Sequence, residues 1–384
     1  MNIMIRRATS AGIVLLLAAP AAAQEPSRDF ERQIDRHIER LIEAHAREFA
    51  RLIEAGAREL ERAIEQGPQR AGRPPRPPRP GERGRDGGPE VTERFSRTIR
   101  LDRNGTFDLS NVSGDIIVTG GGGNDVQIDA VKRVRGRSDA DAKALLQETQ
   151  IVVRETGNRI EVRTELPREE RNVRGAAVDY TVAVPQDANV ILRTVAGDMR
   201  ITNVRGELRA ESISGDVQAS GAQRLGALKT VSGDIQVTDA QGDVVNLTSI
   251  SGDTTVRGMK ARGVELTSVS GDLMLTDVEC ERATVRTVNG NITYTGALAR
   301  SGRYELNTHS GDISLMVSAT GFTVEASTFN GDVRSDYALT LGGNQLTSGR
   351  RGPPQNRTIR GAFGDGGASL SLRSFNGNIS IARR

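Results

Sequence analysis

A short turn repeats along the second half of the chain and constrains its fold more than any other feature. The turn reads Ser-Gly-Asp or a close variant, and its glycines are Gly197, Gly215, Gly233, Gly252, Gly271, Gly290, Gly311, Gly331 and Gly377. From Gly197 to Gly331 the successive spacings are 18, 18, 19, 19, 19, 21 and 20 residues. A regular period of this length is typical of a solenoid, in which each repeat buries its apolar side against the next.

Alternation at period two on both sides of each turn predicts two β-strands per repeat. Three sets of equivalent residues are expected to point inward. They are Val217, Ile235, Thr254, Leu273, Ile292, Ile313 and Val333; then Ala219, Val237, Val256, Leu275, Tyr294, Leu315 and Ser335; and, before the turn, Val195, Ile213, Val231, Ile250, Val269, Val288, His309 and Phe329. A file of hydroxyl residues is expected on the outside: Thr194, Ser212, Thr230, Ser249, Ser268, Thr287, Thr308 and Thr328. Because 18 to 20 residues are few for a three-sheet coil, we predict an all-β solenoid, a flattened parallel β-helix with two sheets.

The corner residues indicate their own chemistry. Glycine takes the positive φ that a tight corner needs, and the mid-repeat glycines Gly206, Gly226, Gly242 and Gly263 are expected to mark the opposite corner. The aspartates after the turn glycines would stack about 5 Å apart, and like charges at this spacing repel. The column therefore needs backbone N–H donors or cations. The candidate calcium ladder is Asp198, Asp216, Asp234, Asp253 and Asp272, and Asn291 in the same column favours the hydrogen-bonding role.

Changes in composition divide the chain into five segments. They are a signal peptide (residues 1–23), an amphipathic helix (24–66), a disordered linker rich in Pro and Arg (67–90), a β-rich leader (91–185) and the array with a C-terminal cap (186–384). The signal peptide has Arg6 and Arg7, a short apolar run and three alanines before Gln24. We therefore expect export to the periplasm or cell envelope, with outer-membrane association or secretion left open. The apolar run is too short for a membrane span, and a lone Cys280 allows no internal disulfide.

Residues 28–66 carry an apolar stripe with an 11-residue repeat, as the similarity of 42–52 to 53–63 shows. Such a period gives a straight or right-handed helical bundle, so we expect a homo-oligomer, a coiled coil, through residues 28–66. Binding to a membrane surface and packing onto the solenoid are the alternatives. His37 and His45 on this helix lack a third ligand nearby in the sequence and are expected to lie on its face or flank.

The linker and the net charge bear on partners. Prolines favour a semi-rigid polyproline II spacer, and the arginines among them are consistent with contact to an anionic envelope polymer; a protein partner is the other option. The formal net charge of the whole chain is only +3, which does not indicate a nucleic-acid partner.

The leader is expected to contain two hairpins, one helix and a delivering strand. The first hairpin joins 95–101 to 106–109 around Asn104-Gly105, and the second joins 151–153 to 159–162 around Gly157-Asn158. The helix spans 138–150 with Ser138 or Asp139 as its cap, and the strand spans 179–185. After the array, 342–367 reads as a long surface loop, and the last coil, 369–381, is expected to cap the stack.

Several of these motifs together resemble a known family. The turns in 231–235 and 269–273, the leader strand ending at Val184-Pro185 and the closing Asn376-Gly377-Asn378-Ile379 are similar to the bacterial adhesin-like β-solenoid family of unknown function. The resemblance covers about residues 95–381. It implies a parallel β-solenoid that is exported or associated with the envelope, with no established reaction and no catalytic residues to transfer.

No stretch of the sequence predicts an enzyme. His309 breaks the apolar file but has no second His, nucleophile elbow or carboxylate pair at an identifiable distance, so we name no catalytic residue, cofactor or metal site. The chain has 8 Phe, 4 Tyr and no Trp, which is few for the sugar platforms of a carbohydrate enzyme. We expect a non-enzymatic envelope scaffold or adhesin-like binding module. A polysaccharide-active β-helix enzyme and an envelope-stress signalling accessory protein are the alternatives.

Overall fold

The computed structural model describes residues 89–166, 175–341 and 357–384. The expected signal peptide, the amphipathic helix and residues 67–88 of the linker lie outside this range. The chain divides into two units, 1–76 and 77–384, and every described residue belongs to the second. Within the described residues, no helix has the length and apolar character needed to span a membrane.

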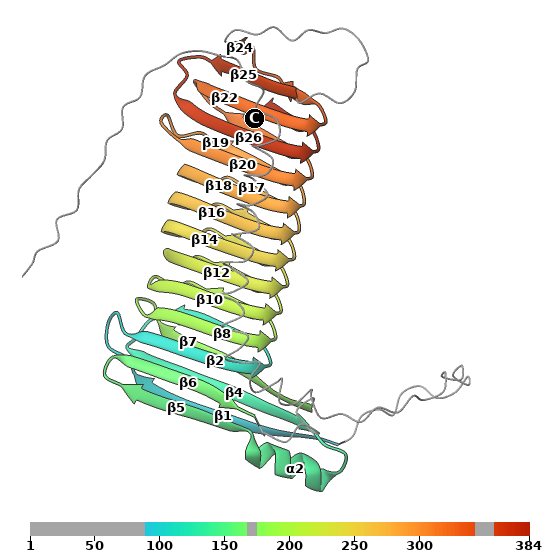
Figure 1. Ribbon diagram of the computed structural model, residues 1–384. Coiled ribbons are helices and arrows are strands. Elements are labelled where there is room, and N and C mark those ends of the chain that lie inside the picture. The colour runs from blue at the N-terminus through green and yellow to red at the C-terminus, as the bar shows by residue number, and fades with distance from the viewer. Residues whose placement is uncertain (1–88, 167–174, 342–356) are drawn as a thin grey trace, which may run out of the picture. The chain divides into compact units, whose positions relative to one another are not determined.

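The unit is built from two long sheets that face each other, as predicted from the short repeat (Figure 1). The first, sheet A, has in spatial order β1 (Glu90–Arg100), β4 (Asp125–Arg135), β7 (Ala176–Pro185), β3 (Ile116–Gly121), β9 (Met199–Thr202), β11 (Val217–Ser220), β13 (Ile235–Thr238), β15 (Thr254–Arg257), β17 (Leu273–Thr276), β19 (Ile292–Ala297), β21 (Ile313–Ser318), β27 (Ile379–Arg383) and β23 (Val333–Ser335). The second, sheet B, has β24 (Thr340–Leu341), β25 (Arg357–Phe363), β22 (Phe322–Asn330), β26 (Ala368–Asn376), β20 (Arg303–Ser310), β18 (Glu279–Asn289), β16 (Lys260–Ser270), β14 (Gln241–Ser251), β12 (Arg224–Ser232), β10 (Glu207–Ser214), β8 (Asn189–Ala196), β2 (Thr106–Ser113), β6 (Arg159–Glu165) and β5 (Gln150–Thr156).

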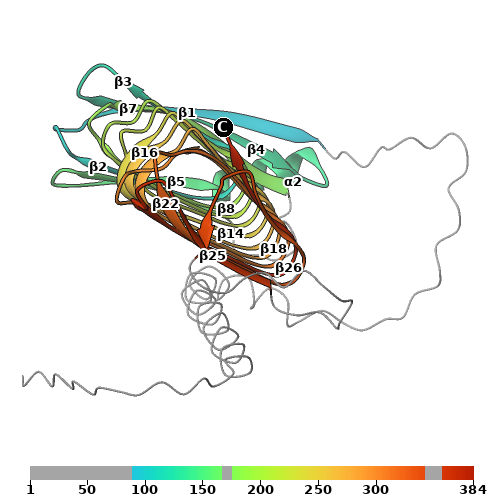
Figure 2. The ribbon, with the colours of Figure 1, turned by 90° about the horizontal axis from the view of Figure 1, so that it is seen from above.

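Each coil runs along sheet B, turns at Ser-Gly-Asp and returns through a short strand of sheet A (Figure 2). Equivalent residues of neighbouring coils pair in parallel register, for example Leu247 with Leu266 and Val237 with Val256. The post-turn residues of the array are buried as expected, except Val333 and Ser335, which are half-buried. A continuous apolar column therefore runs through the array, because each coil covers the one beneath it.

The expected inward and outward files just before the turn are reversed. The hydroxyl file is buried, with Thr230 fully covered, whereas Val231 and its equivalents lie on the outer face, where all are half-buried except the exposed Phe329. The position three residues before the glycine lies inside the curve of the corner, where a small polar side chain meets backbone carbonyls. Thr308 Oγ1 donates to the Gly290 carbonyl at 3.0 Å, and Ser374 Oγ to that of Gly311 at 3.0 Å. In some coils the hydroxyl has no partner within the described residues: Ser212, Ser249, Ser268 and Thr287.

The second corner is also formed differently from the prediction. Its left-handed residues are Asn203, Gly221, Asp239, Gly258 and Asp277, with φ between 51° and 66°. Asn and Asp tolerate this conformation better than other residues with a Cβ, so glycine is not required in every coil. The predicted corner glycines, Gly206, Gly226, Gly242 and Gly263, have no positive φ.

The leader forms the N-terminal end of the stack. Its second hairpin is confirmed as β5–β6, its helix as α2 (Asp139–Glu148) capped by the Ser138 side chain, and the delivering strand as β7. The first hairpin is wrong: β1 pairs antiparallel with β4 in sheet A, and β2 pairs with β6 and β8 in sheet B. The turn at Asn104-Gly105 carries the chain from one sheet to the other, because β2 is itself the sheet B half of a coil.

The C-terminal end departs from chain order. The last coil, β26–β27, lies between β20–β21 and β22–β23 rather than at the end of the stack. β25, within the predicted surface loop, pairs antiparallel with β22. Phe322, Tyr337 and Phe363 pack ring to ring there, with centroids 4.7 to 5.6 Å apart. This aromatic cluster covers the end of the stack at β22. The last coil therefore occupies the position between β22 and β20.

Candidate functional site along the turn edge

The Ser-Gly-Asp corners line up along one edge of the stack, which we call the turn edge. Its glycines superpose in the order Gly114, Gly197, Gly215, Gly233, Gly252, Gly271, Gly290, Gly311, Gly377 and Gly331. Those from Gly114 to Gly377 have φ between 113° and 159°, a region that side chains with a Cβ rarely adopt. A Cβ on any glycine from Gly197 onward would overlap the carbonyl oxygen of the glycine beneath. The turn glycines therefore form a continuous column along this edge.

The residues after these glycines form a continuous hydrogen-bonded ladder. In each coil the backbone N–H donates to the side-chain Oδ1 of the residue below, at 2.7 to 3.1 Å. From one end to the other the ladder contains Asp179, Asp115, Asp198, Asp216, Asp234, Asp253, Asp272, Asn291, Asp312, Asn378 and Asp332. Local N–H donors therefore meet each carboxylate, and this was one of the two solutions expected for a column of like charges.

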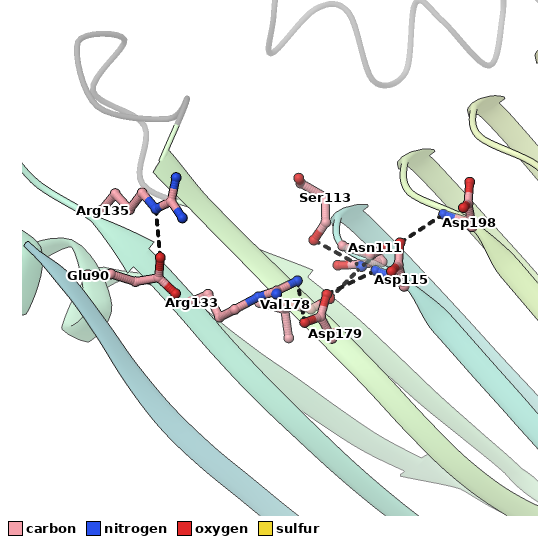
Figure 3. A network of polar contacts seen from close by, with 10 residues as sticks. Glu90, Asn111, Ser113, Asp115, Arg133, Arg135, Val178, Asp179 and Asp198 are labelled. Atoms are coloured by element: carbon pink, nitrogen blue, oxygen red, sulfur yellow. Dashed lines mark hydrogen bonds and ion pairs between the residues drawn. The ribbon is translucent and has the colours of Figure 1, made fainter. Parts of the chain in front are cut away.

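The ladder is longer than the sequence repeat indicated. Asp179 belongs to β7 rather than to a turn, yet its carboxylate accepts the first N–H, from Asp115 (Figure 3). Asn111 takes the place of the corner hydroxyl, and its Nδ2 donates to the carbonyls of Ser113, Gly114 and Val178 at 2.8 to 3.1 Å. The early Ser113-Gly114-Asp115 copy was the signal for this coil, but Asp179 had no signal because a different strand supplies it.

The charge of the ladder is compensated at its two ends. Among the described residues, the ion pairs that reach it are Arg133 with Asp179, and Arg334 and Arg357 with Asp332. The seven acids between them form no ion pair within that part of the chain: Asp115, Asp198, Asp216, Asp234, Asp253, Asp272 and Asp312. No set of three or more His, Cys, Asp or Glu side chains in the described ranges is placed to hold a metal ion. Calcium binding by the ladder stays a prediction.

The ladder predicts a simple contrast between two substitutions at one rung. Asp253→Ala removes the acceptor of the Asp272 N–H and is expected to lower the free energy of unfolding by about 1 kcal/mol. Asp253→Asn keeps an acceptor, as Asn291 does naturally, and relieves like-charge repulsion, so a change within about 0.5 kcal/mol is expected. Urea unfolding followed by circular dichroism measures both, and equal losses would contradict the role of the hydrogen bond.

An apolar file runs beside the glycines on the outer face of sheet B. In spatial order it contains Val112, Val195, Ile213, Val231, Ile250, Val269, Val288, His309, Phe375 and Phe329. His309 stacks on Phe375, and Phe375 on Phe329, with centroids 4.8 Å apart in both pairs. Phe329 is 38% exposed. His309 is therefore one rung of an aromatic stack, and no catalytic partner among the described residues contacts it.

Cys280 lies in the interior, away from the turn edge, with Tyr294 and Tyr304. The Tyr304 hydroxyl donates to the Cys280 carbonyl at 2.7 Å and accepts from the Ala299 N–H at 2.9 Å. Burial raises the pKa of the Cys280 thiol to about 11. The thiol is therefore neutral at physiological pH, which agrees with the expected packing role and not with a nucleophile.

The repeated turns of the array also match a known family model. Residues 226–382 match the family described as Toastrack DUF4097. This part of the chain is similar to the Toastrack family. The match is narrower than the resemblance inferred from the motifs, and it spans the array from near the start of β12 to the inserted strands β26 and β27.

Several solved bacterial structures match this chain at low sequence identity. One is a candidate adhesin from Bacteroides fragilis, with 12% identity over 76% of this chain and 97% of that one and a TM-score of 0.35. Another is a candidate cell adhesion protein from Clostridium sporogenes, with 11% identity, 76% and 100% coverage and a TM-score of 0.20. A candidate lipid-binding protein from Parabacteroides distasonis has 13% identity, 59% and 92% coverage and a TM-score of 0.36. No protein of curated function matches the sequence.

Proposed function

We propose that this protein is a non-enzymatic, exported scaffold of the cell envelope, an adhesin-like binding module that uses the turn edge as its contact surface. The observation that carries the proposal is the regular succession of exposed and half-buried side chains along that edge. The acidic ladder and the apolar file both extend over ten coils at one residue per coil. Such a surface suits an extended partner, because every coil offers the same pair of contacts about 4.8 Å further on.

The chemistry of the edge defines the partner that it favours. Each of the seven acids without an ion pair has a second carboxylate oxygen, Oδ2, that the backbone N–H ladder does not use, although Asp272 Oδ2 accepts from Asn291 Nδ2 at 3.4 Å. The neighbouring apolar file adds half-buried Val and Ile side chains and the exposed Phe329. A basic, partly apolar protein segment of the envelope fits both features.

The segments before residue 89 supply two further parts of the proposal. The signal peptide of residues 1–23 directs export, and the helix at residues 28–66 assembles copies of the chain, so that several turn edges act together. Binding by several linked sites raises avidity without any new contact. Deleting residues 24–90 is expected to lower the number of chains per particle, obtained by dividing the light-scattering mass by the mass of one chain, and an unchanged number would refute assembly through this segment.

The contact role of the turn edge is tested by binding to isolated cell envelopes. A variant with Asp198, Asp216, Asp234, Asp253 and Asp272 all changed to Asn keeps the ladder acceptors and is expected to bind envelopes at least tenfold more weakly. A matched control changes five exposed acids away from the edge: Glu207, Asp243, Glu265, Glu279 and Glu281. Equal binding by both variants would refute the contact role, and release of reducing ends or unsaturated sugars from envelope polysaccharide would favour the enzyme alternative.

A further inference from the structure

Among the described residues, β1 is the longest strand with an unpaired edge. Sheet A ends at β1 and β23 in this part of the chain, and sheet B ends at β24 and β5. β23 and β24 are only 3 and 2 residues long, whereas β1 has 11 residues and pairs with β4 without a register break from Glu90 to Arg100. A long, regular edge strand offers a row of backbone donors and acceptors to another chain.

Backbone bonds at both ends of β1 show which residues face that edge. The Leu101 N–H donates to Asn124 at 2.7 Å, and the Pro89 carbonyl accepts from Gly136 at 3.3 Å. Odd-numbered residues therefore direct their polar groups toward β4, and the backbone groups of the even-numbered residues alternate to the opposite side. The open edge thus presents N–H and C=O groups from Glu90, Thr92, Arg94, Ser96, Thr98 and Arg100.

The sequence of β1 is complementary to itself when it is read in the opposite direction. An antiparallel pair with its two-fold axis at Phe95 places Glu90 opposite Arg100, Val91 opposite Ile99, Thr92 opposite Thr98, Glu93 opposite Arg97 and Arg94 opposite Ser96. Opposite charges, apolar residues and threonines all meet a suitable partner, and no like charges are directly opposed. In this register the even-numbered residues pair through their free backbone groups.

The free edge of sheet B does not have this property. This edge is β5, Gln150–Thr156. Paired with itself about Val153, it would place Ile151 opposite Glu155 and Val152 opposite Arg154. Apolar residues would then face charges on both sides of the axis, so self-pairing at β5 is disfavoured.

The surroundings of β1 leave its open edge accessible within the described residues. Helix α2 packs on the inward face of sheet A, where Leu145 and Leu146 cluster with Val134 and Ala176 and where Val91 of β1 packs against them. The even-numbered side chains of β1 are all exposed. Phe95, at the centre of β1, is half-buried and borders a shallow pocket of about 380 Å³ with Lys132 and Ile151. A second copy would bring its own Phe95 beside this ring and cover apolar surface that is left at the end of the stack.

We propose that β1 pairs antiparallel with β1 of a second copy of this chain, about a two-fold axis at Phe95. Sheet A then continues from one copy into the other. This interface is separate from the assembly proposed for residues 28–66 and does not depend on it.

Register-specific cross-linking tests this pairing in the full chain from residue 24. In the double variant Thr92→Cys/Thr98→Cys, the thiol at position 92 of one copy lies opposite the thiol at position 98 of the other copy, within disulfide reach. In one chain the two positions are six residues apart, about 20 Å in a strand, and cannot bridge. Oxidation is expected to give a covalent dimer of the double variant, and neither single variant is expected to cross-link. In a parallel assembly each residue would instead lie near the same residue of the second copy. Cross-linking of the single variants would therefore overturn the proposal.

A proline at the open edge provides the second test. Ser96→Pro removes an N–H that faces away from β4, so the β1–β4 pairing keeps its bonds while the edge loses a central donor. Added to the double cysteine variant, it is expected to reduce the covalent dimer at least tenfold with an unchanged circular dichroism spectrum, whereas Ser96→Ala has no effect. A dimer yield that Ser96→Pro leaves unchanged, or a double variant that cross-links no better than the single variants, would refute the interface.

Discussion

Replacing Gly252 by valine is expected to lower the free energy of unfolding by more than about 4 kcal/mol, or to prevent folding altogether. Gly252 has φ of 139°, and a Cβ at this position would overlap the carbonyl oxygen of Gly233 in the coil beneath. The side chain cannot move away from a backbone atom, so the two coils must separate. Separation breaks the backbone ladder as well as the Asp253–Asp234 rung.

Gly263 provides the matched control for this change. It lies in the neighbouring strand β16, has no positive φ, and a Cβ there would come no closer than 3.6 Å to Val244. Gly263→Ala is therefore expected to change the free energy of unfolding by less than about 1 kcal/mol. Urea titration followed by circular dichroism compares the two variants. Similar losses for both would show that the turn column is not where steric constraint is concentrated.

The second large effect concerns which side chains form the core. Leu247 is 1% exposed and lies in a column with Leu228 and Leu266. Leu247→Ala leaves a cavity between coils that are held apart by their own backbone hydrogen bonds. The expected loss is about 2 to 5 kcal/mol, because the rigid stack cannot collapse into the space.

Ile250 in the same strand gives the comparison that tests the inward and outward assignment. It belongs to the outer apolar file and is half-buried, so Ile250→Ala is expected to cost less than about 1.5 kcal/mol, mostly from contacts with Val231 and Val269. The sequence pattern alone predicted that Ile250 points inward. A loss for Ile250→Ala as large as that for Leu247→Ala would restore that prediction, and thermal or urea unfolding distinguishes the two results.

The repeating turn was sufficient to predict the architecture of the array. Its period predicts two sheets, its glycines predict a column with positive φ, and the aspartates predict backbone N–H acceptors. The structure has the two sheets and the acceptors, and it has positive φ at every predicted turn glycine except Gly331. These features are local, because each depends on residues within one coil and on the identical residues of the next. The resemblance based on the same turns also agrees with the Toastrack match over residues 226–382.

The candidate site was less accessible from the sequence. The apolar file was identified as a set of equivalent residues but assigned to the core, because Val and Ile usually point inward in alternating strands. In the structure the corner hydroxyl takes the inward position, since a small side chain fits inside the curve and reaches carbonyl oxygens such as that of Gly290. The two positions before the turn therefore have the opposite orientation to the one that hydrophobicity alone predicts: the hydroxyl residue points inward and the Val or Ile residue points outward.

The sequence by itself determined how each coil is built, since the period, the corner glycine and the alternating strands specify a coil without reference to distant residues. The tertiary structure alone decided how the coils are ordered and closed. The last coil enters between two earlier ones, β1 joins β4 and has no second partner strand among the described residues, and Asp179 begins the ladder from another strand. The physical reason is that equivalent coils present nearly the same edges to one another, so only the unique contacts at the two ends, such as the packing of Phe322 with Tyr337, decide which edges meet.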